Sequence, residues 1–342
     1  MRIDLNSFSG GVFFTSDIPD VDISGTSGVS QLVTITCDGD QILQEQMWPM
    51  GNAITLTDLG ELLEPYARQR LVTHVTISAG SSSASATVLF ARADVGIAAA
   101  DFYSDYFLSV LQGPKVTAMG RLELLWYYGS DSAYVTAEYS DGTQASMAAV
   151  TATSSVEYSC IDASPDNYTA AGKTLTAYTV TAGNRSQRYE IDHQQPDCAP
   201  ILEFYNSFGV WELLYCTGTH KVSPEYKRDT ARIGGLLTAY KIEETRNFEG
   251  DTGILSTAMA AWADELFRSD EVYVVNVYSG SVAGRDEGKA VVITASKSEV
   301  TNDEDDLPHF SFTYQYAQRI HNVLQLGRVG RIFDNTFDHT FN

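Results

Sequence analysis

Short runs rich in Val, Thr, Tyr and Ile recur along the chain, and each run is bounded by Gly, Asp, Asn or Ser. This pattern is typical of many β-strands joined by turns. Near the C-terminal end, Phe310, Phe312, Tyr314 and Tyr316 alternate with polar residues, which is the period of a strand with one buried face. The sequence therefore predicts a mainly β fold. Other strands are expected at residues 31–36, 71–78, 85–90, 121–128, 133–139, 175–181, 187–192, 211–217, 231–246, 271–278 and 289–296.

Asp-Gly steps mark two of the expected turns, and a glycine pair marks an irregularity in a strand. Asp38-Gly39 and Asp141-Gly142 stand where tight hairpin turns are expected, because glycine tolerates a positive φ. Gly234-Gly235 interrupts the run at residues 231–246, and we interpret it as a bulge or bend within one long strand.

Two short helices are expected within this β framework. In residues 58–66, Asp58 and Glu61 have the spacing of a capping pair, and Pro65 limits the length of the helix. In residues 256–269, apolar side chains recur at helical spacing after a Ser256 or Thr257 cap.

The length of 342 residues suggests about two domains. Residues 140–170 are poor in large aliphatic side chains, so we place the boundary there. The predicted fold is two β-sandwich-like domains with one short helix each and an extended C-terminal peptide. The expected ranges are 1–150 for the N-terminal sandwich, 151–325 for the second β-rich domain, and 326–342 for a docking peptide.

The chain is strongly acidic, with 22 Lys and Arg against 44 Asp and Glu and a net charge of −22. Nucleic-acid binding needs a basic face, so no nucleic-acid partner is expected. The first residues lack the apolar core of a secretory signal, and no apolar run reaches the ~18 residues of a membrane span. We expect a soluble protein without membrane insertion.

Motifs of known enzymes are missing from the sequence, so we expect no catalytic residue, no cofactor and no enzymatic activity. Gly284, Gly288 and Lys289 are similar to a phosphate-binding loop. However, only three residues separate the two glycines, where such a loop has four, and Ala290 stands after the lysine in place of Ser or Thr. A hairpin tip explains this segment better.

The residues that could bind a metal ion are not grouped at the spacing of a known metal site. The six histidines are dispersed, and the acidic run at residues 302–306 lacks the pattern of an EF-hand loop, which leaves a solvated connection or a Ca²⁺ site as interpretations. The predicted metal site is none. The four cysteines form no CxxC pair, so free buried thiols are expected, with a Cys198–Cys216 disulfide as the alternative.

Aromatic side chains suggest two binding hypotheses. Four tryptophans and many tyrosines could stack on sugar rings, although most stand in strand or helix patterns, where core packing is the default. The end of the chain carries a near-repeat of aromatic residues spaced by polar ones, and these residues either insert into a neighbouring subunit or pack onto their own domain. The candidate assembly contacts are Phe333, Asp334, Phe337, Asp338 and Phe341.

Several segments together resemble the tail proteins of bacteriophages and prophages from gut Bacteroidetes. The segments that carry the resemblance are residues 57–66, 211–218, 227–232, 251–255, the helix with Trp262 and Leu266, residues 271–273, 291–294, 310–314 and 331–337.

This resemblance implies a virion component of the distal tail or baseplate, made in the bacterial cytoplasm, whose β-sandwich subunits form a ring. The implied partners are other tail proteins and further copies of the chain. A carbohydrate-binding or host-attachment module of a tail tip or cell surface is the alternative.

Overall fold

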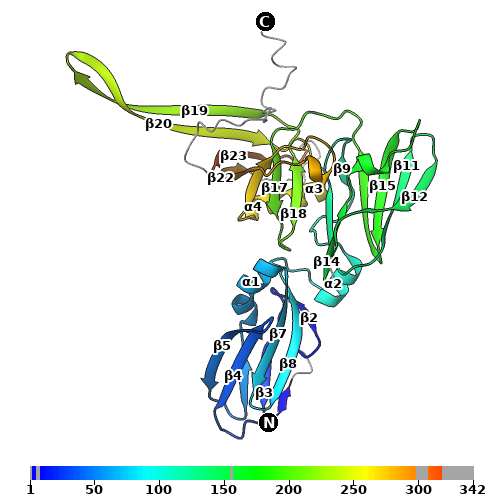
Figure 1. Cartoon of the computed structure of the whole chain (residues 1–342), viewed down its shortest axis with the longest axis vertical. Coiled ribbons are helices and arrows are strands. Elements are labelled where there is room, and N and C mark those ends of the chain that lie inside the picture. The colour runs from blue at the N-terminus through cyan, green and yellow to red at the C-terminus, as the bar shows by residue number, and fades with distance from the viewer. Residues whose placement is uncertain (1, 5–7, 155–156, 298–306, 318–342) are drawn as a thin grey trace.

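The computed structural model describes residues 2–4, 8–154, 157–297 and 307–317. Strands dominate these residues, and the helices are few and short, which confirms the prediction of a mainly β fold. The strands form three successive β units, which follow one another from blue to cyan, from cyan to green, and from green through yellow to orange in Figure 1. None of the described helices is long and apolar enough to cross a membrane.

The first unit, the N-terminal sandwich, packs a sheet in the order β1-β3-β6 against a sheet in the order β2-β8-β7-β4-β5. Alternate residues such as Val33 and Ile35 of one sheet meet Val21 and Ile23 of the other in a shared, fully buried core. Its strands are β1 (Arg2–Asp4), β2 (Val12–Phe14), β3 (Val21–Ser24), β4 (Gln31–Cys37), β5 (Asp40–Met47), β6 (Ala53–Leu56), β7 (Val72–Ala79) and β8 (Ser82–Leu89).

Helix α1 (Leu59–Arg70) belongs to this sandwich and buries Leu59, Leu63 and Ala67. The expected end near Pro65 was wrong, because the helix accommodates this proline and continues to Arg70. The expected capping pair is also not formed, since Asp58 has a left-handed backbone and its side chain makes no cap hydrogen bond. Tertiary packing of the apolar stripe therefore outweighs both local signals.

The middle sandwich combines a sheet in the order β10-β14-β13 with a sheet in the order β12-β11-β15-β16-β9. Tyr127 and Ile161 from the first sheet and Val135 and Tyr178 from the second share its core. Its elements are α2 (Ala99–Asp105), β9 (Lys115–Thr117), β10 (Leu124–Tyr128), β11 (Ala133–Tyr139), β12 (Gln144–Ala148), β13 (Val150–Ser154), β14 (Tyr158–Asp162), η1 (Pro165–Tyr168), β15 (Leu175–Ala182) and β16 (Arg185–Ile191).

The boundary expected near residue 150 falls inside this middle sandwich. β10 pairs with β14, and β11 pairs with β15, so strands from both sides of residue 150 lie in the same sheets. The small, polar residues that suggested a linker form β12 and β13, which are edge strands of the two different sheets.

The third unit is one seven-stranded sheet in the order β18-β17-β21-β22-β23-β20-β19. Trp262 and Leu266 of its helices pack with Phe248 and Phe312 of the sheet, and all four side chains are buried. Its elements are β17 (Ile201–Tyr205), β18 (Trp211–Tyr215), β19 (His220–Ile233), β20 (Leu236–Asp251), α3 (Thr257–Ala263), α4 (Glu265–Arg268), β21 (Val272–Val275), η2 (Val282–Gly284), β22 (Lys289–Lys297) and β23 (Ser311–Tyr316).

The helix expected at residues 256–269 is divided at Asp264 into α3 and α4. Its predicted cap is confirmed, because the Ser256 hydroxyl accepts a hydrogen bond from the Met259 backbone N–H at 3.2 Å. The alternation in β23 is confirmed as well: Phe312 and Tyr314 are buried and Ser311 is exposed.

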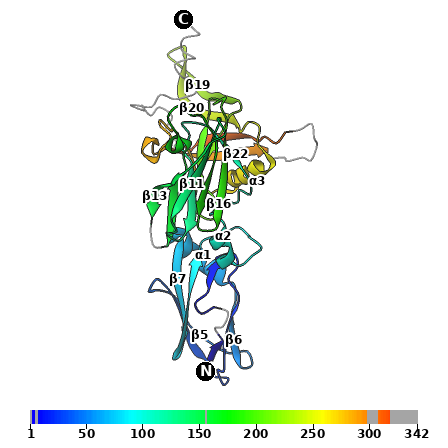
Figure 2. The ribbon, with the colours of Figure 1, turned by 90° about the vertical axis from the view of Figure 1, so that its right-hand side faces the viewer.

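Aromatic rings join the three units. Phe14 of β2, Phe102 of α2 and Phe208 of the turn between β17 and β18 contact one another, with the Phe102 and Phe208 ring centroids 5.1 Å apart. The N-terminal sandwich thus forms one end of the molecule, while the middle sandwich and the seven-stranded sheet lie at the other (Figures 1 and 2).

Candidate functional site

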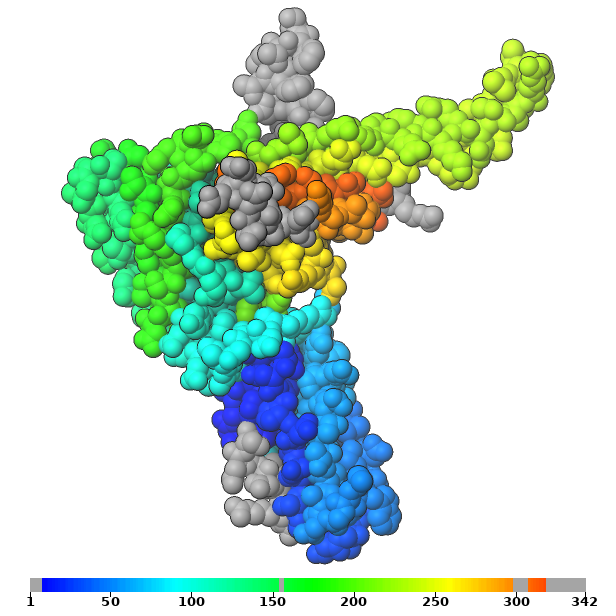
Figure 3. Space-filling model, turned by 180° about the vertical axis from the view of Figure 1, so that it is seen from behind, coloured from blue at the N-terminus to red at the C-terminus, as the bar shows by residue number. Residues whose placement is uncertain are grey.

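A long β-hairpin extends from the seven-stranded sheet into solvent (Figures 1 and 3). β19 and β20 pair with each other from His220 and Gly250 outward to Ile233 and Leu236. β20 pairs with its other neighbour, β23, only from Phe248 to Asp251. Residues 223–247, which we call the arm, therefore leave the sheet as a two-stranded ribbon of roughly 35 Å, at about 3.3 Å per residue.

Gly234 and Gly235 form the turn at the tip of the arm. Their φ angles are 60° and 87°, and a two-residue hairpin turn of this kind needs positive φ at both positions. The interpretation of this glycine pair as a bulge within one strand was wrong. Two consecutive glycines between β-rich runs are a hairpin signal, and that signal was present in the sequence.

The outer part of the arm exposes large apolar side chains. Leu236 and Leu237, at the tip, are 73% and 69% exposed. Ile242 and Phe248 are separated by an even number of positions on β20, so they lie on the same side of the ribbon. Leu236 pairs with Ile233 and Leu237 pairs with Arg232, so the two leucines lie on opposite sides of the ribbon, and both sides of the arm expose apolar side chains. The exposed set consists of Tyr226, Ile233, Leu236, Leu237, Tyr240 and Ile242.

The charge of this outer part is opposite to that of the chain. Residues 226–242, which we call the distal arm, contain one acidic residue, Asp229, against four basic ones, which gives +3. Since the whole chain carries −22, the remainder carries −25. The basic residues are Lys227, Arg228, Arg232 and Lys241.

A cleft of about 940 Å³ lies where the three units meet. Aromatic side chains from two units line it, namely Trp126 and Tyr158 of the middle sandwich and Tyr205 and Trp211 of the seven-stranded sheet. The indole Nε1 of Trp126 donates to the carbonyl oxygen of Trp211 at 3.1 Å, which ties the two aromatic walls together.

Ion pairs cross the mouth of this cleft. The Arg92 guanidinium donates to Glu64 and to Asp270, both at 2.7 Å, and Arg68 contacts the same Asp270 carboxylate at 3.0 Å. The hydrogen bond from Arg92 holds the pKa of Asp270 below its usual range. These contacts link the N-terminal sandwich to the segment before β21.

The charges lining the cleft balance. Four arginines and four carboxylates line it, so its wall is close to neutral in a strongly acidic molecule. Aromatic faces in a neutral wall suit a neutral polar ring, such as a sugar, better than a charged ligand. The charged residues are Arg68, Arg70, Arg92, Arg268, Asp94, Glu265, Asp270 and Glu271.

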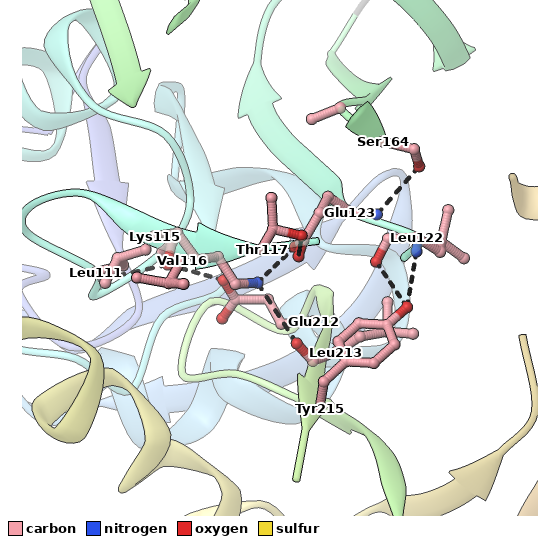
Figure 4. Close-up of polar contacts among 12 residues, drawn as sticks. Leu111, Lys115, Val116, Thr117, Leu122, Glu123, Ser164, Glu212, Leu213 and Tyr215 are labelled. Atoms are coloured by element: carbon pink, nitrogen blue, oxygen red, sulfur yellow. Dashed lines mark hydrogen bonds and ion pairs between the residues drawn. The ribbon is translucent and has the colours of Figure 1, made fainter. Parts of the chain in front are cut away.

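A buried polar cluster joins the middle sandwich to the seven-stranded sheet (Figure 4). The ammonium group of Lys115 donates to Glu123 Oε2 at 2.7 Å, and the Thr117 hydroxyl donates to Glu123 Oε1 at 2.8 Å. Lys115 also lies 4.3 Å from the centroid of the Trp262 ring. The Lys115 ammonium group also donates to the carbonyl oxygen of Leu213 in β18 at 3.4 Å, so a buried charge of the middle sandwich is held against the seven-stranded sheet.

Glu212 lies beside this cluster. It accepts hydrogen bonds from the Ser109 hydroxyl at 2.8 Å and from the Asn206 amide at 3.0 Å. Burial raises the pKa of Glu212 above its usual range, against the opposing charge of Lys115. Its partners are side chains at the interface between the middle sandwich and the seven-stranded sheet. We therefore interpret the cluster as a structural contact between these two units.

The predicted assembly contacts Phe333, Asp334, Phe337, Asp338 and Phe341 lie outside the described residues, as does the acidic run at residues 302–306. The assembly hypothesis for the C-terminal peptide therefore stays a prediction. Among the residues that the structure describes, no group of three or more metal-ligating side chains gathers.

The segment with Gly284, Gly288 and Lys289 connects the antiparallel strands β21 and β22, in agreement with its interpretation as a hairpin connection. All four cysteines are buried thiols, which confirms the expectation of thiols over a Cys198–Cys216 disulfide.

The tryptophans have different surroundings. Trp262 is fully buried and Trp48 is 74% exposed on the N-terminal sandwich, whereas Trp126 and Trp211 line the cleft. The hypothesis of sugar stacking is therefore confined to the latter pair and their tyrosine neighbours.

Comparisons with known proteins identify no family. No family model matches the chain, and no curated protein matches it. Among solved structures, a titin fragment is 10% identical over 54% of this chain and 95% of its own, with a TM-score of 0.24. A tandem of titin domains is 9% identical over 91% of this chain and 87% of its own, with a TM-score of 0.17. These likenesses are too low to carry an argument about function.

Proposed function

We propose that the chain is a structural subunit of a bacteriophage tail, in the distal tail or baseplate, that acts by protein–protein assembly. The observation that carries this proposal is the arm, which leaves the body of the protein and exposes six large apolar or aromatic side chains. Isolated two-stranded ribbons are marginally stable in water. An arm of this kind is expected to gain most of its order from a protein surface that covers it.

The sequence resemblance supplies the tail context, and three connected β units suit a subunit that works by its surfaces. The partners in this proposal are other tail proteins and further copies of the chain, and the location is the virion. The C-terminal residues Phe333, Phe337 and Phe341 are proposed as a second contact.

The arm gives the first test. The double substitution Leu236→Asp and Leu237→Asp places two charges on the apolar tip and should prevent incorporation into tails, measured by electron microscopy and by the mass of purified particles. The control is Ile254→Asp, at a residue of the body that is 68% exposed and thus comparable to the tip. Normal incorporation of the double variant would contradict the proposal.

The C-terminal peptide gives an independent test. Deletion of residues 331–342 should leave a folded protein whose association with itself or its partners is weakened. Circular dichroism checks the fold, and light scattering measures the association. Unchanged association would remove the peptide from the proposal and leave the arm as the assembly contact.

A carbohydrate-binding or host-attachment module is the second candidate, and the aromatic cleft favours it. A glycan array with the purified chain tests this alternative. Trp211→Ala should abolish glycan binding, whereas Trp48→Ala, at an exposed residue outside the cleft, should leave it unchanged. Glycan binding by a chain that never assembles would favour this module over the tail subunit.

A further inference from the structure

We propose that the distal arm of one copy binds the N-terminal sandwich of a second copy, at a patch formed by Val29, Leu32, Trp48 and Met50. This inference rests on the proposed function, because it names the partner and the receiving surface of the arm. Three observations support the inference: both surfaces expose apolar side chains, their units have opposite net charges, and the two surfaces lie at different ends of the molecule.

The patch is the second place where exposed apolar side chains gather. Met50 is 92% exposed and Trp48 is 74% exposed, and Val29 and Leu32 are 59% and 48% exposed. Leu32 pairs with Gln46 at the open end of the β4–β5 hairpin. Val29 lies just before β4, and Trp48 and Met50 lie just after β5, so all four residues belong to this end. Large apolar side chains that are exposed next to one another mark interaction surfaces.

The net charges of the distal arm and of the N-terminal sandwich have opposite signs. The distal arm carries +3, as counted above, whereas residues 1–91, which include the N-terminal sandwich, have three basic and ten acidic residues and carry −7. Opposite charges steer two surfaces together and suppress contacts between like surfaces, so arm-to-arm pairing is disfavoured. A negatively charged membrane is a poorer partner, since the remaining −25 of the chain would be repelled by it.

The arm and the N-terminal sandwich lie at different ends of the molecule (Figure 1). A contact between the arm of one copy and the patch of the next is therefore head-to-tail, and each bound copy still offers a free arm and a free patch. Such a contact closes into a ring or continues as a filament.

Mixing two variants tests this arrangement. One variant carries Leu236→Asp and Leu237→Asp on the arm, and the other carries Trp48→Asp and Met50→Asp on the patch. Each variant alone should associate at least ~10-fold more weakly than the unchanged chain, measured by light scattering coupled to size exclusion. A 1:1 mixture should form a heterodimer and nothing larger, because only one intact arm and one intact patch remain complementary.

Three results would overturn the inference: an unchanged chain that stays monomeric, a patch variant that associates normally, or a mixture without heterodimers. The Ile254→Asp chain should associate as the unchanged chain does, and thermal melting shows that each variant is folded. Vesicles of anionic lipid should not retain the protein, and retention lost in the arm variant would also overturn it. If the unchanged chain is monomeric but the arm variant fails to enter tails, the self-contact is wrong and the proposed tail function stands.

Discussion

Burial sets the chemistry of the cysteine residues. Desolvation raises the pKa of Cys37 to about 11 and that of Cys160 to about 12. At pH 8 about one Cys37 thiol in a thousand is then ionised, and the thiolate is the reactive form. We expect the native protein to react with a thiol reagent far more slowly than the unfolded protein, in which all four cysteines should react. Rapid reaction of the native chain would contradict this burial.

Glu212 should make stability depend on pH in a defined direction. Its pKa in the folded protein is raised by burial above the reference of 4.5, so the unfolded state loses its proton first as pH rises. The stability associated with the protonated form is thus complete below pH 4.5 and is lost as pH increases through the folded pKa. Each pKa unit corresponds to about 1.4 kcal/mol.

Glu212→Gln removes this titration. The free energy of unfolding of the variant, relative to the unchanged chain, should therefore increase from pH 4.5 to pH 7, measured by urea denaturation at both values. A difference that does not change with pH would refute the role given to Glu212. Thr230→Ser on the arm, far from the buried cluster, is a suitable control.

At the scale of elements, the turn of the arm depends on two glycines with positive φ. Gly234→Val should strain the tip by about 1 kcal/mol or more, because a β-branched residue disfavours that backbone region. The arm should then exchange its amide hydrogens faster, while the melting temperature of the body stays the same. Thr238→Val, beside the turn, is the control, and equal exchange in both variants would argue against the turn assigned here.

The sequence predicts the strands better than their connections. The alternation in β23 and the Ser256 cap are local signals, and both appear in the structure. The path of α1 through Pro65 depends on packing against the sandwich, which no local pattern contains. Grouping strands into sheets depends on pairs distant in sequence, such as β9 with β16, so the β12 and β13 region could be mistaken for a linker.

In the candidate site, too, features that depend on contacts between distant residues could not be predicted from the sequence. The exposure of the arm was not predictable, because its Tyr, Leu and Ile residues have the composition of a buried strand. The cleft was not predictable either, since it combines Trp126, Tyr205 and Arg68 from three different units. The tryptophans were nevertheless recognisable as candidates from residue type alone.

At the scale of the molecule, a cluster of three aromatic rings joins the three units. Phe208→Ala removes the ring that contacts both Phe14 and Phe102, and should lower the free energy of unfolding by about 3 kcal/mol. Arg92→Ala breaks exposed ion pairs across the cleft and should cost about 1 kcal/mol or less. Calorimetry should also show the N-terminal sandwich of the Phe208 variant unfolding separately, and an equal effect of both substitutions would contradict this order.

Assembly with further copies or with other tail proteins changes the mass of the particle that contains the chain, and this mass can be measured in solution. The chain has a mass of 37.4 kDa, so size exclusion with light scattering distinguishes a monomer from a ring or filament without ambiguity. We expect a mass that is a multiple of this value and rises with concentration, and that falls to the monomer when Leu236 and Leu237 are replaced by Asp. A chain that remains at 37.4 kDa at every concentration, alone and with other tail proteins, would contradict assembly.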